Sequence, residues 1–412
     1  MISVDEARER ILGHARVLEP VRVPILDALN MVLAEDLIAG FDIPPLTNAA
    51  MDGYAVLATD TARASTAAPV RLRVIEELPA GRPARHAVEA GTAIRIMTGA
   101  PLPGGADTVV QFENTTEGQG VTPNGWVDVL VPAGPGINIR QAGEDVRQGH
   151  EIVRRGATLR PADIGVIASL GRADVLVHRR PRVAILSTGD EVIEPGRALE
   201  PGQIYDANGY ALAAQVKSAG GEPVMLGIAR DEMGDLVARI RRGLETDLIV
   251  TSAGVSTGDY DIVKDALVAQ GEISFWLVRM RPGKPLAFGQ IGGIPHIGLP
   301  GNPVSSMISF ELFARPAILK MLGKTDFDRP TIEAVASDVI INRENRRSFF
   351  RARIDRSDDG YVASLTGPQG SGILTSMMQA NCLLVVPEHV SRVNPGDRVR
   401  VVLIDQPETS SV

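Results

Sequence analysis

After residue 179 the sequence alternates short apolar runs with segments of helical periodicity, and this order constrains the fold more than any other feature. The runs are RVAILS, EPVMLGIA and DLIVTS, and the segments that follow them are NGYALAAQVKSAG, DLVARIRRGL and YDIVKDALVAQ. Strands that alternate with helices in this way pair in parallel and are covered on both faces. Residues 179–325 are therefore predicted to form a three-layer α/β domain with a mainly parallel sheet.

The rest of the chain is predicted to form further domains, because 412 residues exceed the roughly 250–300 residues of a single core. Short β-like runs separated by Gly and Pro, such as VRLRVIEEL and TVVQFE, predict a small β domain inserted over residues 48–140. Helical patterns on both sides of it indicate a discontinuous N-terminal linker domain made of residues 1–47 and 141–178. Only strand-like runs follow, so residues 326–405 are predicted to form a C-terminal β-barrel-like domain.

Local signals predict where several helices lie. Ser3 and Glu6 have the spacing of a capping box, in which the hydroxyl accepts from an amide one turn later. Apolar spacing predicts a second helix over residues 25–34 and another over residues 161–170. Asn302, followed directly by a proline, is predicted to cap the last helix of the α/β domain.

Composition and charge exclude several classes of protein. Apolar residues make up 44% of the chain and charged residues 22%, which is typical of globular proteins. The chain has no run of about 18 apolar residues and no apolar core of a secretory signal, so we expect a soluble, cytoplasmic protein that does not bind membranes. A formal net charge of −8 disfavours binding to nucleic acids, and an anionic substrate would need a locally basic site.

The cysteine and histidine residues do not predict a metal or redox centre. Cys382 is the only cysteine and lies in the apolar run CLLVVP, so we expect a buried, unreactive thiol and no disulfide within the chain. The 6 histidines are scattered without the spacing of metal ligands, and no zinc site is expected.

Polar loops follow four strands of the predicted parallel sheet, at the edge where such sheets bind ligands. They cover residues 188–191, 230–232, 254–261 and 299–303. The loop after DLIVTS is rich in glycine and precedes a helix, so its amides can bind an anion, although a plain turn has the same composition. It lacks the Gly-Lys-Ser/Thr ending of a Walker loop.

Three carboxylates, Glu191, Asp231 and Asp259, are predicted to share this edge of the sheet. Mg²⁺ prefers one or two carboxylates together with phosphate oxygens, so the set predicts a magnesium site. Carboxylates after strands also cap helices, and for Asp231 and Asp259 that alternative stays open.

The segment VRMRPGKP supplies the basic element that an anionic substrate would require. Arg279, Arg281 and Lys284 lie in it, and Pro282 with Gly283 excludes a regular helix, so a turn of fixed geometry is expected. Taken alone, the same segment is also compatible with an exposed hairpin.

Two motifs of the inserted β domain are explained poorly by local structure alone. They are NAAMDGYAV, which contains Asp52, and IMTGAPLP, which contains Thr98. A turn is the alternative for Asp52, because a glycine follows it.

In the C-terminal domain, residues 370–372 and Ser376 are candidates for turns and strand ends. Arg346, Arg347, Arg351 and Arg353 form a basic strand, which is either a solvated face or a second part of an anion site.

Together these motifs resemble the MoeA family of molybdopterin molybdenumtransferases, which is related to the E domain of gephyrin. The matching segments span residues 48–372 in the order of the family. They are NAAMDGYAV, RIMTGAPLPGGADTVV, IRQAGEDVRQG, ILSTGDEV, YDANGYAL, SAGVSTGDYD, MRPGKPLAFG, GLPGNPVSS and GPQGSG. A departure is Arg281, where a lysine is common.

The resemblance implies a homodimer of four-domain subunits, with an α/β domain of the molybdopterin-binding type. It also implies an active cleft between that domain of one subunit and the inserted β domain of the other. The residues that it implies as catalytic are Asp52, Thr98, Glu191, Asp231, Asp259 and Lys284, of which Glu191, Asp231 and Asp259 would hold the metal. The residues that it implies as substrate-binding are Gly254, Ser256, Thr257, Gly258, Arg281, Pro300, Gly301, Asn302, Arg351, Ser371 and Ser376.

The activity implied by the resemblance is the insertion of molybdate into adenylylated molybdopterin with release of AMP, with Mg²⁺ as cofactor. Molybdate would lie near Arg281, Lys284 and Ser371, and the phosphates near the loops 254–259 and 299–302. Transient contacts with a molybdopterin adenylyltransferase and with molybdoenzyme acceptors are expected. A molybdopterin adenylyltransferase and a non-catalytic scaffold that binds cofactor are the alternatives.

Overall fold

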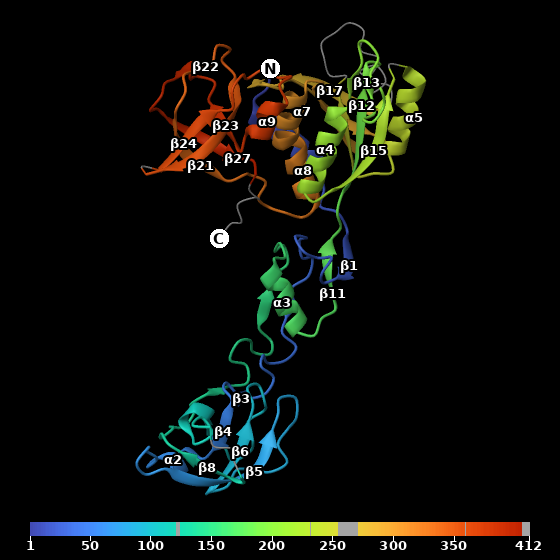
Figure 1. Ribbon diagram of the computed structural model, residues 1–412. Coiled ribbons are helices and arrows are strands. Elements are labelled where there is room, and N and C mark those ends of the chain that lie inside the picture. Colours follow the sequence, from blue (N-terminus) through green and yellow to red (C-terminus); the bar gives the residue numbers. More distant parts are fainter. Residues whose placement is uncertain (121–123, 231, 254–270, 359, 406–412) are drawn as a thin grey trace. The chain divides into compact units, whose positions relative to one another are not determined.

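The computed structural model (Figure 1) describes residues 1–120, 124–230, 232–253, 271–358 and 360–405. The chain divides into two compact units. The first is formed by Met1–Ala34, Gly156–Arg160 and Val175–Val412, and the second by Glu35–Arg155 and Pro161–Asp174. The chain therefore passes between the two units four times, because Gly156–Arg160 returns to the first unit before Pro161–Asp174 completes the second.

The first unit contains a six-stranded mixed sheet in the order β15-β12-β16-β20-β19-β17. The parallel strands are β15 (Glu222–Ala229), β12 (Arg182–Thr188), β16 (Leu248–Ser252) and β20 (Ile294–Leu299). Antiparallel pairing then adds β19 (Pro285–Ile291) and β17 (Gly271–Leu277). The predicted mainly parallel sheet and the strands after residue 179 are confirmed.

Helices cover both faces of this sheet. Alternate residues of β12 belong to two different cores. Val183 and Ile185 pack with α4 (Ala207–Ser218), α7 (Pro303–Ser309) and α8 (Arg315–Met321). The π-helical turn η2 (Phe310–Ala314) joins α7 to α8. Ala184 and Leu186 pack with Leu236 and Ile240 of α5 (Met233–Gly243). The three-layer arrangement is thus confirmed, and the helix predicted at YDIVKDALVAQ lies outside the described residues.

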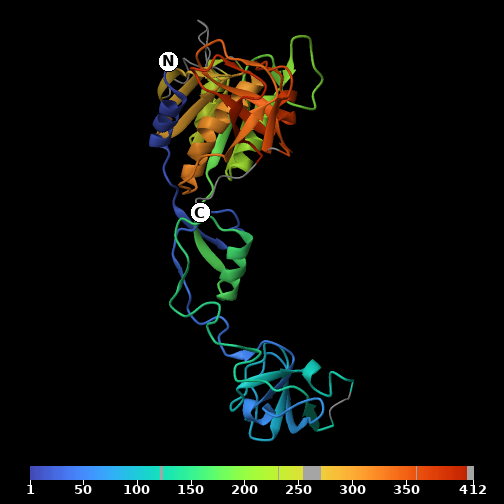
Figure 2. The same cartoon turned by 90° about the vertical axis from the view of Figure 1, so that its left-hand side faces the viewer.

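The N-terminal helix joins the same core. In α1 (Val4–His14), the Oγ of Ser3 accepts a hydrogen bond from the Glu6 amide at 3.0 Å, which confirms the predicted cap. Val4, Ala7 and Ile11 form its buried face, and the helix, dark blue in Figure 2, packs against α8.

The helix predicted over residues 25–34 is wrong. β1 (Pro20–Pro24) ends at this point and a turn follows, in which Asn30 has a φ of 64°. This left-handed conformation ends any helical turn, and the next residues, Val32 and Leu33, bridge to Thr158 and Val177 as extended chain. The apolar spacing thus came from a turn followed by a short extended segment. β1 pairs with β11 (Asp174–His178).

The C-terminal region is a closed five-stranded barrel, as predicted. Its strands are β23 (Arg347–Ser357), β24 (Gly360–Leu365), β21 (Thr331–Ala336), β27 (Arg398–Leu403) and β25 (Cys382–Val386), and pairing of β25 with β23 closes it. Cys382 lies in the barrel core, where burial raises the pKa of its thiol to about 12.

Smaller elements surround the barrel and the large sheet. They are β18 (Met280–Arg281), which pairs with β23, β22 (Ile340–Ile341), which pairs with β26 (Arg392–Val393), and β13 (Val192–Ile193), which pairs with β14 (Ile204–Tyr205). α9 (Thr375–Gln379) is helical, so the expectation that only strands follow residue 325 is wrong there. A helix of this length is too short to show periodicity in sequence.

The second unit is built on a five-stranded sheet in the order β7-β4-β6-β5-β8. These strands are β7 (Thr108–Gln111), β4 (Gly53–Val56), β6 (Thr92–Ile96), β5 (Val70–Leu78) and β8 (Trp126–Val129). The remaining elements are α2 (Ala58–Thr61), the 3-10 turn η1 (Phe112–Asn114), α3 (Pro161–Ser169), and the pairs β3 (Asn48–Ala49) with β9 (Ile139–Arg140) and β2 (Leu37–Ile38) with β10 (Glu151–Val153). α3 confirms the helix predicted over residues 161–170. Across the described part of the chain, no helix combines the length and apolar character needed to cross a bilayer.

Candidate functional site

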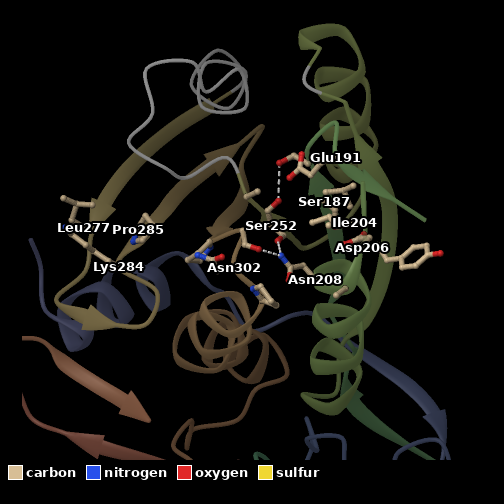
Figure 3. A pocket seen from close by; sticks show the side chains of 18 residues that line it. Ser187, Glu191, Ile204, Asp206, Asn208, Ser252, Leu277, Lys284, Pro285 and Asn302 are labelled. Carbon is tan, nitrogen blue, oxygen red and sulfur yellow. Dashed lines mark hydrogen bonds between the residues drawn. The ribbon is translucent and has the colours of Figure 1, made fainter. Parts of the chain in front are cut away.

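The larger of two neighbouring pockets in the first unit lies at the carboxyl ends of the parallel strands (Figure 3). Its volume is about 830 Å³, and its walls come from the ends of β12 and β16, the loop after β20 and the first turn of α4. Lys284 and Pro285 lie on the opposite side of the pocket from Glu191 and Asp206. This is the edge at which open parallel sheets bind ligands.

Two of the four predicted polar loops contribute to this pocket. Thr188 and Glu191 line it from one loop, and residues 300–303 line it from another. Arg230 and Glu232 are not among its lining residues, and residues 231 and 254–261 lie outside the described part of the chain. The predicted convergence is thus seen for the loops after β12 and β20.

The loop after β20 brings Pro300, Gly301 and Asn302 to the pocket. Asn302 occupies the N-cap position of α7, but its side chain makes no capping hydrogen bond, so the predicted role as a side-chain cap is wrong. Its carbonyl oxygen instead accepts from the Ser306 amide at 2.9 Å. The exposed amide side chain therefore stays available to a ligand in the pocket.

Glu191 is exposed at the mouth of the larger pocket. Its carboxylate folds back over Gly189, where a Cβ atom would lie 2.6 Å from Glu191 Oε2 and where φ is 130°. Only glycine combines this φ with the close approach of the carboxylate. The carboxylate oxygens are of the kind that Mg²⁺ prefers, and they face a pocket large enough for a phosphorylated ligand.

Asn208 and Asp206 are pocket residues that the sequence reasoning missed. Asn208 Nδ2 donates to Ser252 Oγ at 2.8 Å and to the Gly301 carbonyl at 2.6 Å, which ties the end of β16 to the loop after β20 (Figure 3). Asp206 is buried and caps α4 by accepting from the Gly209 amide at 2.8 Å. Both residues belong to the segment YDANGYAL, whose strand-to-helix position was the available signal.

A smaller pocket of about 360 Å³ lies between the barrel and the turn formed by Pro282, Gly283 and Lys284, which we call the PGK turn. We call it the cationic pocket, because Arg281, Lys284, Arg346 and Arg351 line it together with Ser371. Lys284 lines both pockets, so the two cavities are neighbours. The predicted anion site thus has four positively charged side chains from two distant segments.

Arg351 is the buried member of this set, since only 1% of the residue is exposed to solvent. Its Nε donates to Ser376 Oγ at 3.0 Å and its Nη2 to the Gly370 carbonyl at 3.0 Å. Burial, and then the charge of Arg281, lowers the pKa of Arg351 to about 10. Ser376 therefore orients the guanidinium from behind and does not line the pocket itself.

The other arginines of the basic segment have different surroundings. Arg347 pairs with Asp5 at 2.9 Å, and Arg353 pairs with Asp355 on the exposed surface of the barrel. The basic segment is therefore neither wholly a solvated face nor wholly an anion site: Arg351 lines the cationic pocket, whereas Arg347 and Arg353 form ion pairs outside it. Arg279 is exposed and lines neither pocket.

Strand pairing and a glycine fix the turn that carries Lys284, and a backbone hydrogen bond fixes the 370–372 loop. Arg281 is paired with Ser348 where β18 joins β23. Gly283 has a φ of 92°, and a Cβ atom there would lie 2.5 Å from Ser309 Oγ, so glycine is required. The Val304 amide donates to the Ser371 carbonyl at 3.0 Å, which holds the 370–372 loop against α7.

Asp52 and Thr98 lie together in the second unit. Asp52 Oδ1 accepts from the Thr98 amide at 2.7 Å and from Thr98 Oγ1 at 2.8 Å. The Thr98 amide, and then its hydroxyl, lowers the pKa of the Asp52 carboxyl below its ordinary value. A Cβ atom added at the neighbouring Gly53 would lie only 2.0 Å from the Val110 carbonyl oxygen, so the turn packs tightly on β7.

Six further predicted site residues lie outside the described part of the chain. They are Asp231, Gly254, Ser256, Thr257, Gly258 and Asp259. Among the described residues, no three histidine, cysteine, aspartate or glutamate side chains gather closely enough to hold a metal ion. The described share of the predicted magnesium site is thus Glu191 alone.

Comparison with protein families matches three models along the chain. Residues 2–171 match the MoeA N-terminal region (domain I and II), and residues 184–320 match a model described as a probable molybdopterin binding domain. Residues 333–404 match the MoeA C-terminal region (domain IV).

Whole-length relatives agree with these matches. A molybdopterin molybdenumtransferase 2 of Mycobacterium tuberculosis is 40% identical, with 97% of this chain and 99% of the relative covered. A molybdopterin molybdenumtransferase of Haemophilus influenzae is 33% identical, with 97% and 98% covered. The crystal structure of a molybdopterin biosynthesis MoeA protein from Pyrococcus horikoshii has a TM-score of 0.82 and 34% identity, with 98% of this chain and 99% of that chain covered.

Proposed function

The chain belongs to the MoeA family, and on that premise we propose that it is a molybdopterin molybdenumtransferase. In this proposal the chain inserts molybdate into adenylylated molybdopterin, and AMP is released. The observation that carries the proposal is the position of Lys284, which lines both the larger pocket and the cationic pocket. One cation can therefore contact an organic phosphate and an oxyanion that occupy neighbouring cavities.

The larger pocket suits the organic substrate. Its volume of about 830 Å³ falls within the range of ligand pockets, about 300–1,000 Å³. Asn302 and the amides around Gly301 provide hydrogen-bond donors for phosphate oxygens. Mg²⁺ would bind Glu191 together with those oxygens and would supply neutralisation of their charge, since one carboxylate with substrate phosphates is a usual magnesium site.

The cationic pocket suits molybdate, a tetrahedral dianion. Arg281, Arg346 and Arg351 would bind its oxygens, with Lys284 at the border toward the organic substrate. Fixed cations of this kind lower the energy of negative charge that develops while a phosphoryl bond breaks. In this proposal the chain contributes positioning and charge stabilisation.

Asp52 and Thr98 are proposed to complete the site from a second subunit of a homodimer. Asp52 is anionic at neutral pH, and the hydrogen bonds from Thr98, which lower the pKa of its carboxyl, stabilise that charge further. A paired carboxylate and hydroxyl can orient a water molecule or a hydroxyl group of the substrate. We expect Asp52→Ala to lower AMP release without altering binding of molybdate to the cationic pocket.

The test is release of AMP from adenylylated molybdopterin with and without molybdate. We expect release to depend on molybdate and to fall about 10²–10³-fold in Lys284→Met, the range for loss of one electrostatic stabiliser. Lys217→Met on α4 is the matched control, because Lys217 lines neither pocket, and should keep wild-type activity. Wild-type activity of Lys284→Met would refute the assignment of the site.

Two other outcomes would replace the proposed activity. Pyrophosphate released by this chain alone from molybdopterin and Mg-ATP would indicate an adenylyltransferase. Binding of adenylylated molybdopterin with no AMP release after addition of molybdate would indicate a scaffold without turnover.

A further inference from the structure

The cationic pocket carries an excess of positive charge. Arg281, Lys284, Arg346 and Arg351 line it, and none of its described lining residues is an aspartate or glutamate. The charge of Arg281 contributes to lowering the pKa values of both Arg346 and Arg351, after the larger effect of burial. The cations therefore repel one another, and the pocket favours any anion that can approach them.

One carboxylate just outside the pocket contacts two of these cations. Glu344 Oε1 lies 3.9 Å from Nη1 of Arg281, and Glu344 Oε2 forms an ion pair with Arg346. Glu344 belongs to the turn between β22 and β23, next to Asn345, which has a φ of 50°. The two carboxylate oxygens thus neutralise charge that a bound oxyanion would otherwise neutralise.

The exposure of these groups decides which of them can move. The side chain of Glu344 is 44% exposed, whereas Arg351 is 1% exposed and is held by Ser376 and the Gly370 carbonyl. A half-exposed carboxylate regains water at small cost when it leaves an ion pair, since pairs near the surface are weak. A buried guanidinium cannot leave without losing its hydrogen bonds.

We propose that Glu344 is a displaceable counter-ion of the cationic pocket, which competes with the incoming oxyanion for Arg281 and Arg346 and so sets the affinity for it. This inference rests on the proposed function of the pocket as the oxyanion site. Entry of the oxyanion moves the Glu344 carboxylate toward solvent and transfers both arginines to the ligand. Glu344 is therefore a residue that tunes affinity and takes no part in the reaction itself.

The test is a calorimetric titration of the full chain with sodium molybdate, and with sodium sulfate as a second tetrahedral dianion. We expect Glu344→Gln to bind both ions more tightly, by about three- to tenfold, because the competing charge is removed while the size of the side chain is kept. In the AMP-release assay the KM for molybdate should fall by a similar factor with kcat unchanged. A purely structural role of Glu344 would not lower KM.

Glu388→Gln is the matched control. Glu388 pairs with Arg347 at 3.5 Å in the same region and does not line the cationic pocket, so its substitution should leave oxyanion affinity unchanged. Equal or weaker oxyanion binding by Glu344→Gln, with the thermal unfolding temperature of the wild type, overturns the counter-ion inference. Wild-type molybdate binding by Arg351→Met would overturn the pocket assignment, which is a separate result.

Discussion

Replacement of Arg351 by methionine should separate the electrostatics of the cationic pocket from the stability of the barrel. Arg351 is buried on β23, and its guanidinium reaches Ser376 Oγ and the Gly370 carbonyl. Methionine keeps most of the volume of the side chain and removes its charge. We therefore expect a large effect on activity and a small effect on folding.

The loss of activity follows from Coulomb's law and from the other cations of the pocket. A unit charge about 4 Å from an oxyanion contributes about 4 kcal/mol at an effective dielectric constant of about 20. Because Arg281, Lys284 and Arg346 remain, the oxyanion can shift toward them and only part of this energy is lost. We expect kcat/KM for molybdate to fall about 10²–10³-fold, or about 2.7–4 kcal/mol, as for other electrostatic stabilisers.

The small effect on stability follows from the pKa of the same group. Burial, and then the charge of Arg281, lowers the pKa of Arg351 to about 10. A base whose pKa is lowered by folding binds its proton less tightly in the folded state, so the charged group costs stability at pH 7. Methionine removes that cost and also the hydrogen bonds to Ser376 and Gly370, and we expect the free energy of unfolding to change by about 1 kcal/mol or less.

The assays are AMP release as a function of molybdate concentration and unfolding in urea. Arg353→Met is the matched control, because Arg353 lies on the same strand with its side chain 61% exposed and should alter neither measurement. An Arg351→Met protein with wild-type kcat/KM would refute the role assigned to the guanidinium. A loss of about 4 kcal/mol in unfolding would instead indicate that Arg351 mainly stabilises the barrel.

Three further substitutions test other parts of the structure. Asp247→Asn should destabilise the chain by about 2–3 kcal/mol at pH 7 in urea unfolding, because Asp247 accepts from both Nη atoms of Arg179 at 2.6 Å. Burial raises the pKa of Asp247, but the hydrogen bonds and charges of Arg179 and Arg182 together lower it below the ordinary aspartate value. This stability is therefore present above the ordinary aspartate pKa and is lost as pH falls through the lowered value, and equal stabilities at pH 7 would contradict it. Asn208→Asp should raise the KM for adenylylated molybdopterin about tenfold with little change in kcat, since it removes the donors that tie the pocket loops together; a fall in kcat alone would argue against a binding role. Gly283→Ala should destabilise the chain by about 1–3 kcal/mol in thermal or urea unfolding, because residue 283 has a φ of 92° and the added Cβ would lie 2.5 Å from Ser309 Oγ. Wild-type stability of this variant would show that the turn can relax.

The parts of the fold that the sequence predicted are those with a long, regular pattern. The strands β12 and β16 are almost continuously buried and β15 is an apolar strand at the edge of the sheet, and their alternation with α4 and α5 specifies a parallel sheet. The helix predicted over residues 25–34 failed because its apolar spacing did not reveal the left-handed conformation of Asn30. The short helix α9 failed for a related reason, since five residues carry less than two turns of pattern.

The candidate site was predictable where a local motif carries its own geometry. The PGK turn predicted Lys284 as a site residue, because a cation after Pro-Gly in an acidic protein indicates an anion site of fixed geometry. Which arginines of β23 face the pocket was not predictable, since that depends on the register of the strand. Asn208 was missed because its function is a pair of contacts to Ser252 and Gly301, which are distant in sequence.

The connection between the two pockets follows from the path of the chain. β18 lies between β17 and β19 in sequence, and those strands belong to the α/β sheet, whereas β18 itself pairs with β23 of the barrel. The chain therefore crosses to the barrel at Met280–Arg281 and returns to the α/β sheet at Pro285, with Lys284 on the returning segment. Because this crossing is tied at both ends by strand pairing, any shift of the barrel relative to the α/β sheet must also displace Arg281 and Lys284. In the proposed function, the oxyanion and the organic substrate would thus be coupled through the backbone of one short turn as well as through charge.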